Sequence, residues 1–153
     1  MPNTYSQIYL QIVFAVKYRE NLLHKSWRDE VFKYMSGIIA KKGHKPIIVN
    51  GVSDHVHVFV GLNPSTSISD LVRDLKSNSS RFINEHNYLH CKFSWQNGFG
   101  VFSYSHSQLD VVYNYINNQE QHHKKTNFRD EYLEFLRKFE IDYDDRYLFE
   151  WMD

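Results

Sequence analysis

Cysteine is almost absent from the sequence. Cys91 is the single cysteine among 153 residues, which excludes an internal disulfide and any zinc site built from several cysteines. This usage is typical of a reducing compartment, so we expect a cytoplasmic protein. The sequence also lacks an apolar run near the roughly 20 residues that cross a bilayer, and the start MPNTYSQIYLQ is too polar for a signal region. We therefore expect no membrane partner.

Linkers and repeats are missing as well. No stretch rich in glycine, proline or serine divides the chain, and no segment recurs along it. Hydrophobic residues make up 42% of the chain, which excludes a disordered protein. A chain of this length buries roughly two-thirds of its unfolded surface. We predict one domain over residues 1–153.

Net charge is absent too, with 18 basic and 18 acidic residues, which at first argues against a nucleic-acid partner. The acids are concentrated at the end, however, because residues 130–153 carry nine acids and three bases. Residues 1–129 therefore carry a net charge of +6. A basic body with an acidic C-terminal segment suits a phosphate-binding surface beside a solvated or docking tail. The same division occurs in proteins that bind no polyanion, so it does not decide the function.

Hydrophobic periodicity predicts the elements. Residues 5–17 alternate between apolar and polar side chains, as in a strand with one wet side. Each of three helices is predicted to open at a serine that is followed three residues later by an aspartate. The predicted order is a strand at 5–17, a helix from Ser26 to Gly43, strands at 45–52 and 53–62, a helix from Ser67, two strands within 92–105 joined by a turn at Gly98 to Gly100, and a helix from Ser107.

This order predicts an α+β fold of the ferredoxin-like split βαβ type. The first two helices would pack on one face of an antiparallel sheet, and the other face would stay open. On the strand SDHVHVFVGL, alternation directs Val56, Val58 and their apolar neighbours to the helix-covered face. His55, His57 and Phe59 would then point to the open face.

The two histidines are about 6.6 Å apart along the strand, near enough for both imidazoles to turn onto one cation. With nine histidines in the chain, one such pair also arises by chance. Known classes of histidine enzyme fit poorly. Histidine-triad hydrolases need a third alternate histidine, where this chain has Phe59. Two-histidine phosphodiesterases need two H-x-T/S elements, and metallo-β-lactamase-like enzymes need a following Asp-His. A site with two histidines and ligands from elsewhere in the chain remains.

The helix from Ser107 offers partners for such a site. Its apolar stripe is predicted to contain Tyr113, together with Leu109, Val112 and Ile116. Tyr115, Gln119 and His122 fall on a neighbouring stripe about 100° around the helix. We therefore expect Tyr115 to project away from the core. By itself this pattern also describes a half-buried tyrosine beside a surface amide.

Four ordered segments, DHVHVFV, the helix with KSNSSR, WQNGFGVFSYS and YINNQEQHH, together resemble the single-tyrosine HUH transposases of the insertion sequence 200/605 type. The segments VKYRENLL and EYLEFLRKFEIDYDDRYLF also fit that family, so the resemblance covers essentially the whole chain. It implies that His55 and His57 are ligands of a divalent cation, Mg²⁺ or Mn²⁺, and that Gln119 is the third protein ligand. Tyr115 would be the nucleophile, which forms a 5′-phosphotyrosine and frees a 3′-hydroxyl.

The resemblance also implies partners. The substrate would be single-stranded DNA hairpins near the ends of a mobile element, and the assembly would be a homodimer with composite active sites, in which the tyrosine helix of one subunit serves the histidines of the other. Six basic residues are plausible contacts to the DNA backbone, although each is also an ordinary surface residue. They are Arg73, Lys76, Arg81, Lys41, Lys42 and Lys45.

Two alternatives stay open at this stage. A domesticated relative would bind or nick repeated hairpins with the same residues but mobilise no element. A non-enzymatic nucleic-acid-binding module on the same plan would use exposed aromatic side chains on the open sheet face. Phe59 is one candidate for that role, but the neighbouring histidines and the matching tyrosine helix weigh against it.

Overall fold

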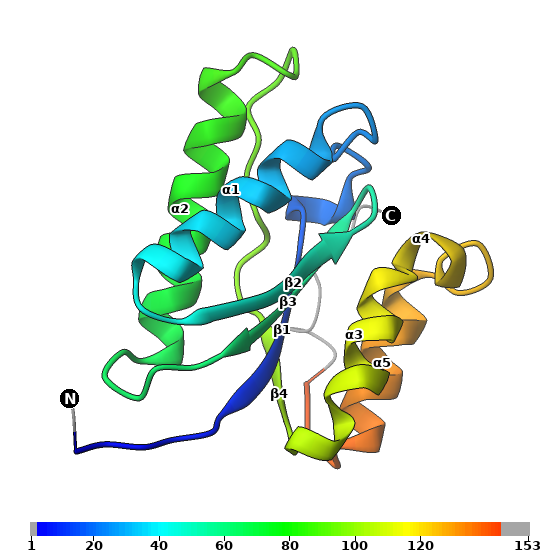
Figure 1. Cartoon of the computed structure of the whole chain (residues 1–153). Coiled ribbons are helices and arrows are strands. Elements are labelled where there is room, and N and C mark those ends of the chain that lie inside the picture. The colour runs from blue at the N-terminus through cyan, green and yellow to red at the C-terminus, as the bar shows by residue number, and fades with distance from the viewer. Residues whose placement is uncertain (1–2, 145–153) are drawn as a thin grey trace.

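The computed structural model describes residues 3–144, and its strands form one antiparallel sheet. The strands are β1 (Tyr9–Ala15), β2 (Lys45–Gly51), β3 (His55–Gly61) and β4 (Gly100–Tyr104), in the order β2-β3-β1-β4. β1 and β3 therefore lie in the middle of the sheet (Figure 1). This order confirms the predicted antiparallel sheet of the split βαβ plan. The final residues of the acidic segment, 145–153, lie outside the described part of the chain.

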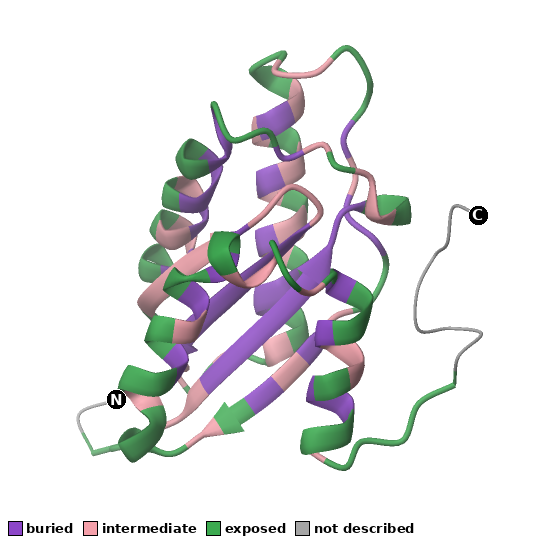
Figure 2. Cartoon of the chain, turned by 90° about the vertical axis from the view of Figure 1, so that its right-hand side faces the viewer, coloured by how far each residue is buried: buried purple, intermediate pink, exposed green. Residues whose placement is uncertain are grey.

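Helices α1 (Arg28–Lys41) and α2 (Ile68–Glu85) pack on one face of the sheet, as predicted (Figure 1). The valines of β3 point into this layer, which confirms the predicted apolar face. The central strands appear as a continuous buried band in Figure 2. The layer is filled by Leu10, Ile12 and Phe14 from β1, Val56, Val58 and Val60 from β3, Val31, Met35 and Ile39 from α1, and Leu71, Leu75 and Ile83 from α2.

The opposite face, which we predicted to be open, is covered by the last helices of the described chain. These are α3 (Leu109–Asn117), the single turn α4 (Gln119–His122) and α5 (Phe128–Lys138) (Figure 1). The physical reason is that the sheet and the helices both have apolar surface to bury. β1 and β4 present apolar side chains on this face, and so do α3 and α5 on the sides that face the sheet. The buried contacts join Val13, Ala15, Phe59 and Phe102 of the sheet to Val112 and Ile116 of α3 and Phe128, Phe135 and Leu136 of α5.

Several element boundaries differ from the prediction. Within the described chain, the predicted strand near residue 95 joins the sheet only through a bridge between Val16 and Trp95. Ser67 caps α2 as predicted, since its Oγ accepts a bond of 3.1 Å from the Asp70 amide. α1 instead begins after Trp27 without a side-chain cap, and α3 follows a short 3₁₀ turn at His106–Gln108. Among the described helices, none is both long and apolar enough to cross a membrane.

Gly100 sets how closely α5 approaches the sheet. A Cβ added at this position would lie 2.7 Å from the ring and the hydroxyl of Tyr132 in α5. Such an approach is too close for an ordinary contact, so the absence of a side chain on β4 lets the tyrosine ring lie against the strand. Gly37 in the middle of α1 is different, because a Cβ there would meet nothing within 4 Å.

We predict opposite effects for alanine at these two glycines. Gly100→Ala should lower the free energy of unfolding by about 1 to 3 kcal/mol, because the Tyr132 ring must move out of its packed position to make room for the methyl group. Gly37→Ala should raise it by about 0.5 to 1 kcal/mol, because alanine is the better helix former. Urea denaturation measures both. An unchanged unfolding free energy in Gly100→Ala would show that α5 does not rest on this contact.

Candidate metal and tyrosine site

His55 and His57 of β3 point from the sheet toward α3 and α5. Both side chains are fully buried, and their ring centroids are 5.1 Å apart. The rings therefore lie on one face, as the alternation predicts. They are covered by the helices, however, and are not on an open surface.

Glu131 of α5 is a buried acid at the centre of the site, with only 4% of its surface exposed. Its Oε1 lies 3.1 Å from Nε2 of His55 and 3.1 Å from Nε2 of His57. The same oxygen lies 3.0 Å from Nε2 of His123, which follows directly after α4. One carboxylate oxygen thus meets three imidazoles, and the ligand atoms of these four residues all lie within 4.8 Å of one another.

Gln119 and Tyr115 meet the other side of this cluster. Gln119 is buried; its Oε1 is 3.2 Å from Nε2 of His55, and its Nε2 donates to Oε2 of Glu131 at 3.2 Å. The Tyr115 hydroxyl donates to the same Oε2, and its ring centroid lies 5.9 Å from that of His57. The structure therefore brings together all four site residues predicted from the motifs, within one chain.

Two tyrosine orientations differ from the prediction. Tyr115, which we expected to project away from the core, is half-buried between α3 and α5 and packs against Phe135. Tyr113, which we assigned to the apolar stripe, is 40% exposed. Both differences have one cause. α5 lies beside α3 and covers the side of α3 that carries Tyr115, whereas the side that carries Tyr113 faces solvent.

A further layer of side chains holds the two histidines. Asp54 Oδ1 lies 2.8 Å from Nδ1 of His55. Nε2 of the buried Gln11 lies 2.9 Å from Nδ1 of His57, and the Tyr104 hydroxyl donates to Oε1 of Gln11 at 2.7 Å. Such bonds fix the ring orientation and leave both Nε2 atoms directed at the centre of the site.

The charges of the cluster are set by burial and by close partners. Burial lowers the pKa of His55, but the bonds and charges of Asp54 and Glu131 outweigh it and raise the pKa to about 9. For Glu131, burial alone would raise the pKa, and the surrounding imidazoles instead hold it well below its usual range. Burial and the neighbouring Glu131 raise the pKa of the Tyr115 phenol. Glu131 is therefore a carboxylate, and Tyr115 is a neutral donor to it.

Sequence reasoning missed His123 and Glu131. A signal for Glu131 was present, because Phe128, Glu131 and Phe135 share one helical stripe, and a carboxylate on an apolar stripe calls for a buried partner. We had assigned this segment to a solvated or docking tail on the basis of its charge. For His123 the sequence gives no comparable signal, since His122 next to it is an equal candidate.

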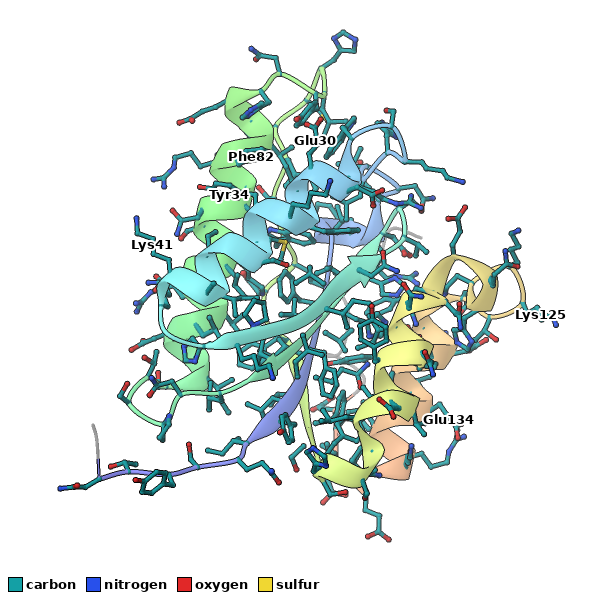
Figure 3. The ribbon with its side chains drawn as sticks, viewed as in Figure 1. Glu30, Tyr34, Lys41, Phe82, Lys125 and Glu134 are labelled. Carbon is teal, nitrogen blue, oxygen red and sulfur yellow. The ribbon has the colours of Figure 1, made fainter. Side chains whose placement is uncertain are left out.

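The predicted DNA contacts lie away from this site, on α1 or directly after it, on α2, or at the start of β2. Lys41 points outward from the end of α1, on the far side of the sheet from Glu134 of α5 (Figure 3). Several of the six side chains have partners within the chain. Arg73 pairs with Asp70 and Asp74, Lys42 pairs with Asp74, Arg81 bonds to Asn78, Lys76 donates to the carbonyls of Gln96 and Gly98, and Lys45 is exposed.

Comparison with known proteins connects this geometry to a family. The family model described as "Transposase IS200 like" matches residues 4–119, which include both histidines, Tyr115 and Gln119. The chain belongs to the IS200-like transposase family. This confirms the resemblance seen in the sequence motifs. The matched segment ends before His123 and Glu131.

Individual proteins also resemble the chain in sequence or in fold. The ISDra2 transposase TnpA of Deinococcus radiodurans is 31% identical over 75 residues, which are 49% of this chain and 54% of that relative. The alignment thus spans about half of each protein. A crystal structure of a protein from Deinococcus radiodurans R1 has a TM-score of 0.62 at 23% identity and covers 76% of this chain and 94% of its own.

A second solved structure, a REP-associated tyrosine transposase bound to a REP hairpin, has a TM-score of 0.59 at 13% identity. The match covers 79% of this chain and 72% of that protein. At these identities, both structures show a common fold.

The raised pKa of His55 predicts a pH dependence of stability in chelator. A histidine whose folded pKa of about 9 exceeds the unfolded value of 6.5 stabilises the fold below pH 6.5 and loses that contribution as pH rises toward 9. The loss should be at most about 3 kcal/mol, and Asp54→Asn should make it smaller. Urea unfolding at pH 6.5 and pH 9 measures it. A loss of equal size in both proteins would contradict the pairing of His55 with Asp54.

Proposed function

We propose that this protein is a DNA transposase that cleaves and rejoins single-stranded DNA at hairpin-marked element ends through a 5′-phosphotyrosine. The observation that carries the proposal is the position of Tyr115, whose ring lies 5.9 Å from that of His57 and whose hydroxyl bonds to the carboxylate that meets both histidines, in a member of a transposase family. A phenol, two imidazoles and a side-chain amide are the groups that this chemistry needs. Here they converge from α3, β3 and α4.

The donor set fits a divalent cation, Mg²⁺ or Mn²⁺. His55 and His57 would offer their Nε2 atoms and Gln119 its Oε1, and all three side chains are buried. Nitrogen and oxygen donors of this kind bind divalent metals. When bound, the cation polarises a non-bridging oxygen of the scissile phosphate and favours departure of the 3′-oxygen.

Tyr115 would form the covalent bond. Its oxygen attacks phosphorus, the bond from phosphorus to the 3′-oxygen breaks, and the leaving oxygen takes up a proton to become a 3′-hydroxyl. Rejoining reverses these steps, and the phosphotyrosine bond retains the energy that it needs. In the present structure the phenol is held as a donor to Glu131, so this bond must be released or its proton accepted before attack.

The substrate would reach Tyr115 through a groove between α3 and α5. The groove has a volume of about 370 Å³, and Tyr115, Tyr104, Val111 and Phe135 are among its lining residues. The bound REP hairpin of one structural relative supports a hairpin as the recognised element. The six basic residues on α1, α2 and β2 stay proposed contacts to the DNA backbone, at a distance from the reacting groups.

A homodimer would hold two element ends together during exchange. In the predicted composite form, the tyrosine helix serves the histidines of the partner. The arrangement within one chain supports a different form, in which Tyr115 serves its own histidines and the dimer only brings two complete sites together.

The alternative of a non-enzymatic module has less support. That module requires an exposed aromatic ring on the sheet, whereas Phe59 is fully buried under Val112 and Ile116 of α3. A domesticated relative would share the site and differ in its genomic surroundings.

Tyr115→Phe should abolish the covalent adduct with single-stranded DNA that carries the hairpin, because phenylalanine lacks the attacking oxygen. Tyr113→Phe is the matched control and should retain the adduct, since Tyr113 is exposed on the same helix. A denaturing gel separates free protein from protein joined to labelled DNA. Loss of the adduct in Tyr113→Phe, with retention in Tyr115→Phe, would reverse the assignment.

Cleavage should require a divalent cation and should stop when His57 is replaced by alanine, because the ion then loses a buried ligand. His90→Ala, at an exposed histidine, should cleave as the wild type does. The assay measures cleaved strand in the presence of Mn²⁺, Mg²⁺ or chelator. Equal cleavage in chelator would exclude a role for the metal.

A further inference from the structure

His123 and Glu131 belong to the buried cluster but lie beyond residues 4–119, the segment that matches the IS200-like family model. Both side chains come from the part of the chain that covers the histidine face of the sheet. They approach the paired histidines closely, and all four ligand atoms lie within 4.8 Å of one another. Two residues from this segment are therefore part of the site.

We propose that His123 and Glu131 complete, with His55 and His57, a three-histidine, one-carboxylate site for a transition-metal ion. The inference rests on the proposed function in taking this ion to be the one that serves DNA cleavage, and of the two ions named there it favours Mn²⁺ over Mg²⁺. Binding of the metal by the four side chains is a separate property that is measurable without DNA.

The separations between donors agree with a shared ion. Neighbouring ligands around an ion with bonds of about 2.1 Å are about 3.0 to 3.4 Å apart. Oε1 of Glu131 lies 3.1 Å from Nε2 of His55, 3.1 Å from Nε2 of His57 and 3.0 Å from Nε2 of His123. All four ligand atoms lie within 4.8 Å of one another, so a cation can replace the protons between them once the carboxylate oxygen moves back from its place among the three nitrogens.

The chemistry of the donors selects the class of metal. Three imidazole nitrogens and one carboxylate oxygen suit Zn²⁺ and the neighbouring transition ions, whereas Mg²⁺ prefers oxygen ligands and keeps most of its water. Burial strengthens this preference, because water has little access to His55, His57 and Glu131. Gln119 Oε1, 3.2 Å from His55 Nε2, remains within reach as a further oxygen donor.

The two oxygens of Glu131 have different partners. Oε1 faces the three imidazoles, while Oε2 accepts bonds from Tyr115 and from the amide of Gln119. Coordination through Oε1 therefore leaves Oε2 to position the Tyr115 hydroxyl. Glu131 would connect the metal ligands directly to the nucleophile.

Calorimetric titration of the full-length, metal-free protein with ZnCl₂, MnCl₂ or MgCl₂ tests the inference. The wild type should bind one Zn²⁺ per chain, and Mg²⁺ at least a hundredfold more weakly. Glu131→Gln and His123→Asn should each weaken Zn²⁺ binding at least tenfold. The matched controls are Glu134→Gln, an exposed acid of the same helix, and His90→Asn, an exposed histidine outside the ligand cluster; both should bind as the wild type does.

Wild-type affinity in both Glu131→Gln and His123→Asn, with loss of binding in His57→Ala, would overturn this inference and leave the metal of the proposed function in place. Absence of Zn²⁺, Mn²⁺ and Mg²⁺ binding in the wild type would overturn both. Far-UV circular dichroism checks that each variant is folded. X-ray absorption at the zinc edge of the wild type needs no variant: three imidazole ligands are expected, and two would contradict the site.

Discussion

The packing of α5 on the histidine face of the sheet depends on one interaction, between the buried carboxylate of Glu131 and the imidazoles around it. A charge in the interior is tolerated only when close partners offset the loss of water. Here the partners are imidazoles from β3 and from the residue after α4. The sheet thus supplies imidazoles that offset the buried charge, and α5 supplies the carboxylate to which they bond. Removing one side of such a buried pair costs about 3 to 5 kcal/mol. The cluster that is proposed to bind metal therefore also fixes α5 against the sheet.

The sequence allowed the sheet, the histidine face of β3 and the cap of α2 to be predicted, because each depends on local periodicity or on a residue next to a helix end. The packing of α3 and α5 over the histidine face depends on tertiary contacts, which local periodicity does not report. The acidic charge of residues 130–153 instead favoured a solvated or docking tail. Phe93 and Trp95 alternate with polar residues, as in a strand, and both of their rings are buried. The strand failed to form because β3 and β4 already occupy both edges of β1, apart from the bridge at Val16.

The side chains behind the histidines can serve the cluster in two hydrogen-bonding states. As described, Gln11 Nε2 donates to Nδ1 of His57, so the ring proton lies on Nε2 and faces Glu131. A metal on Nε2 requires the proton on Nδ1 and an acceptor opposite it. Gln11 provides that acceptor if its amide turns end for end, and the Tyr104 hydroxyl then accepts from the amide nitrogen. Because Tyr104 lines the groove, its own proton can then bond to water there.

Charge around the groove would give the proposed metal a second purpose. Asp130, Glu131 and Glu134 are among the residues lining the approach to Tyr115, against the single ammonium of Lys138. A phosphodiester entering this groove meets carboxylates of its own sign, at distances where repulsion is strong in a partly buried space. The basic side chains of α2 cannot compensate, because they lie across the sheet and Arg73 is paired with Asp70 there. A divalent ion that replaces the proton between His55 and Glu131 would raise the local positive charge. DNA binding near Tyr115 and metal binding at the histidines, both as proposed, would therefore be coupled by electrostatics, whichever of them occurs first.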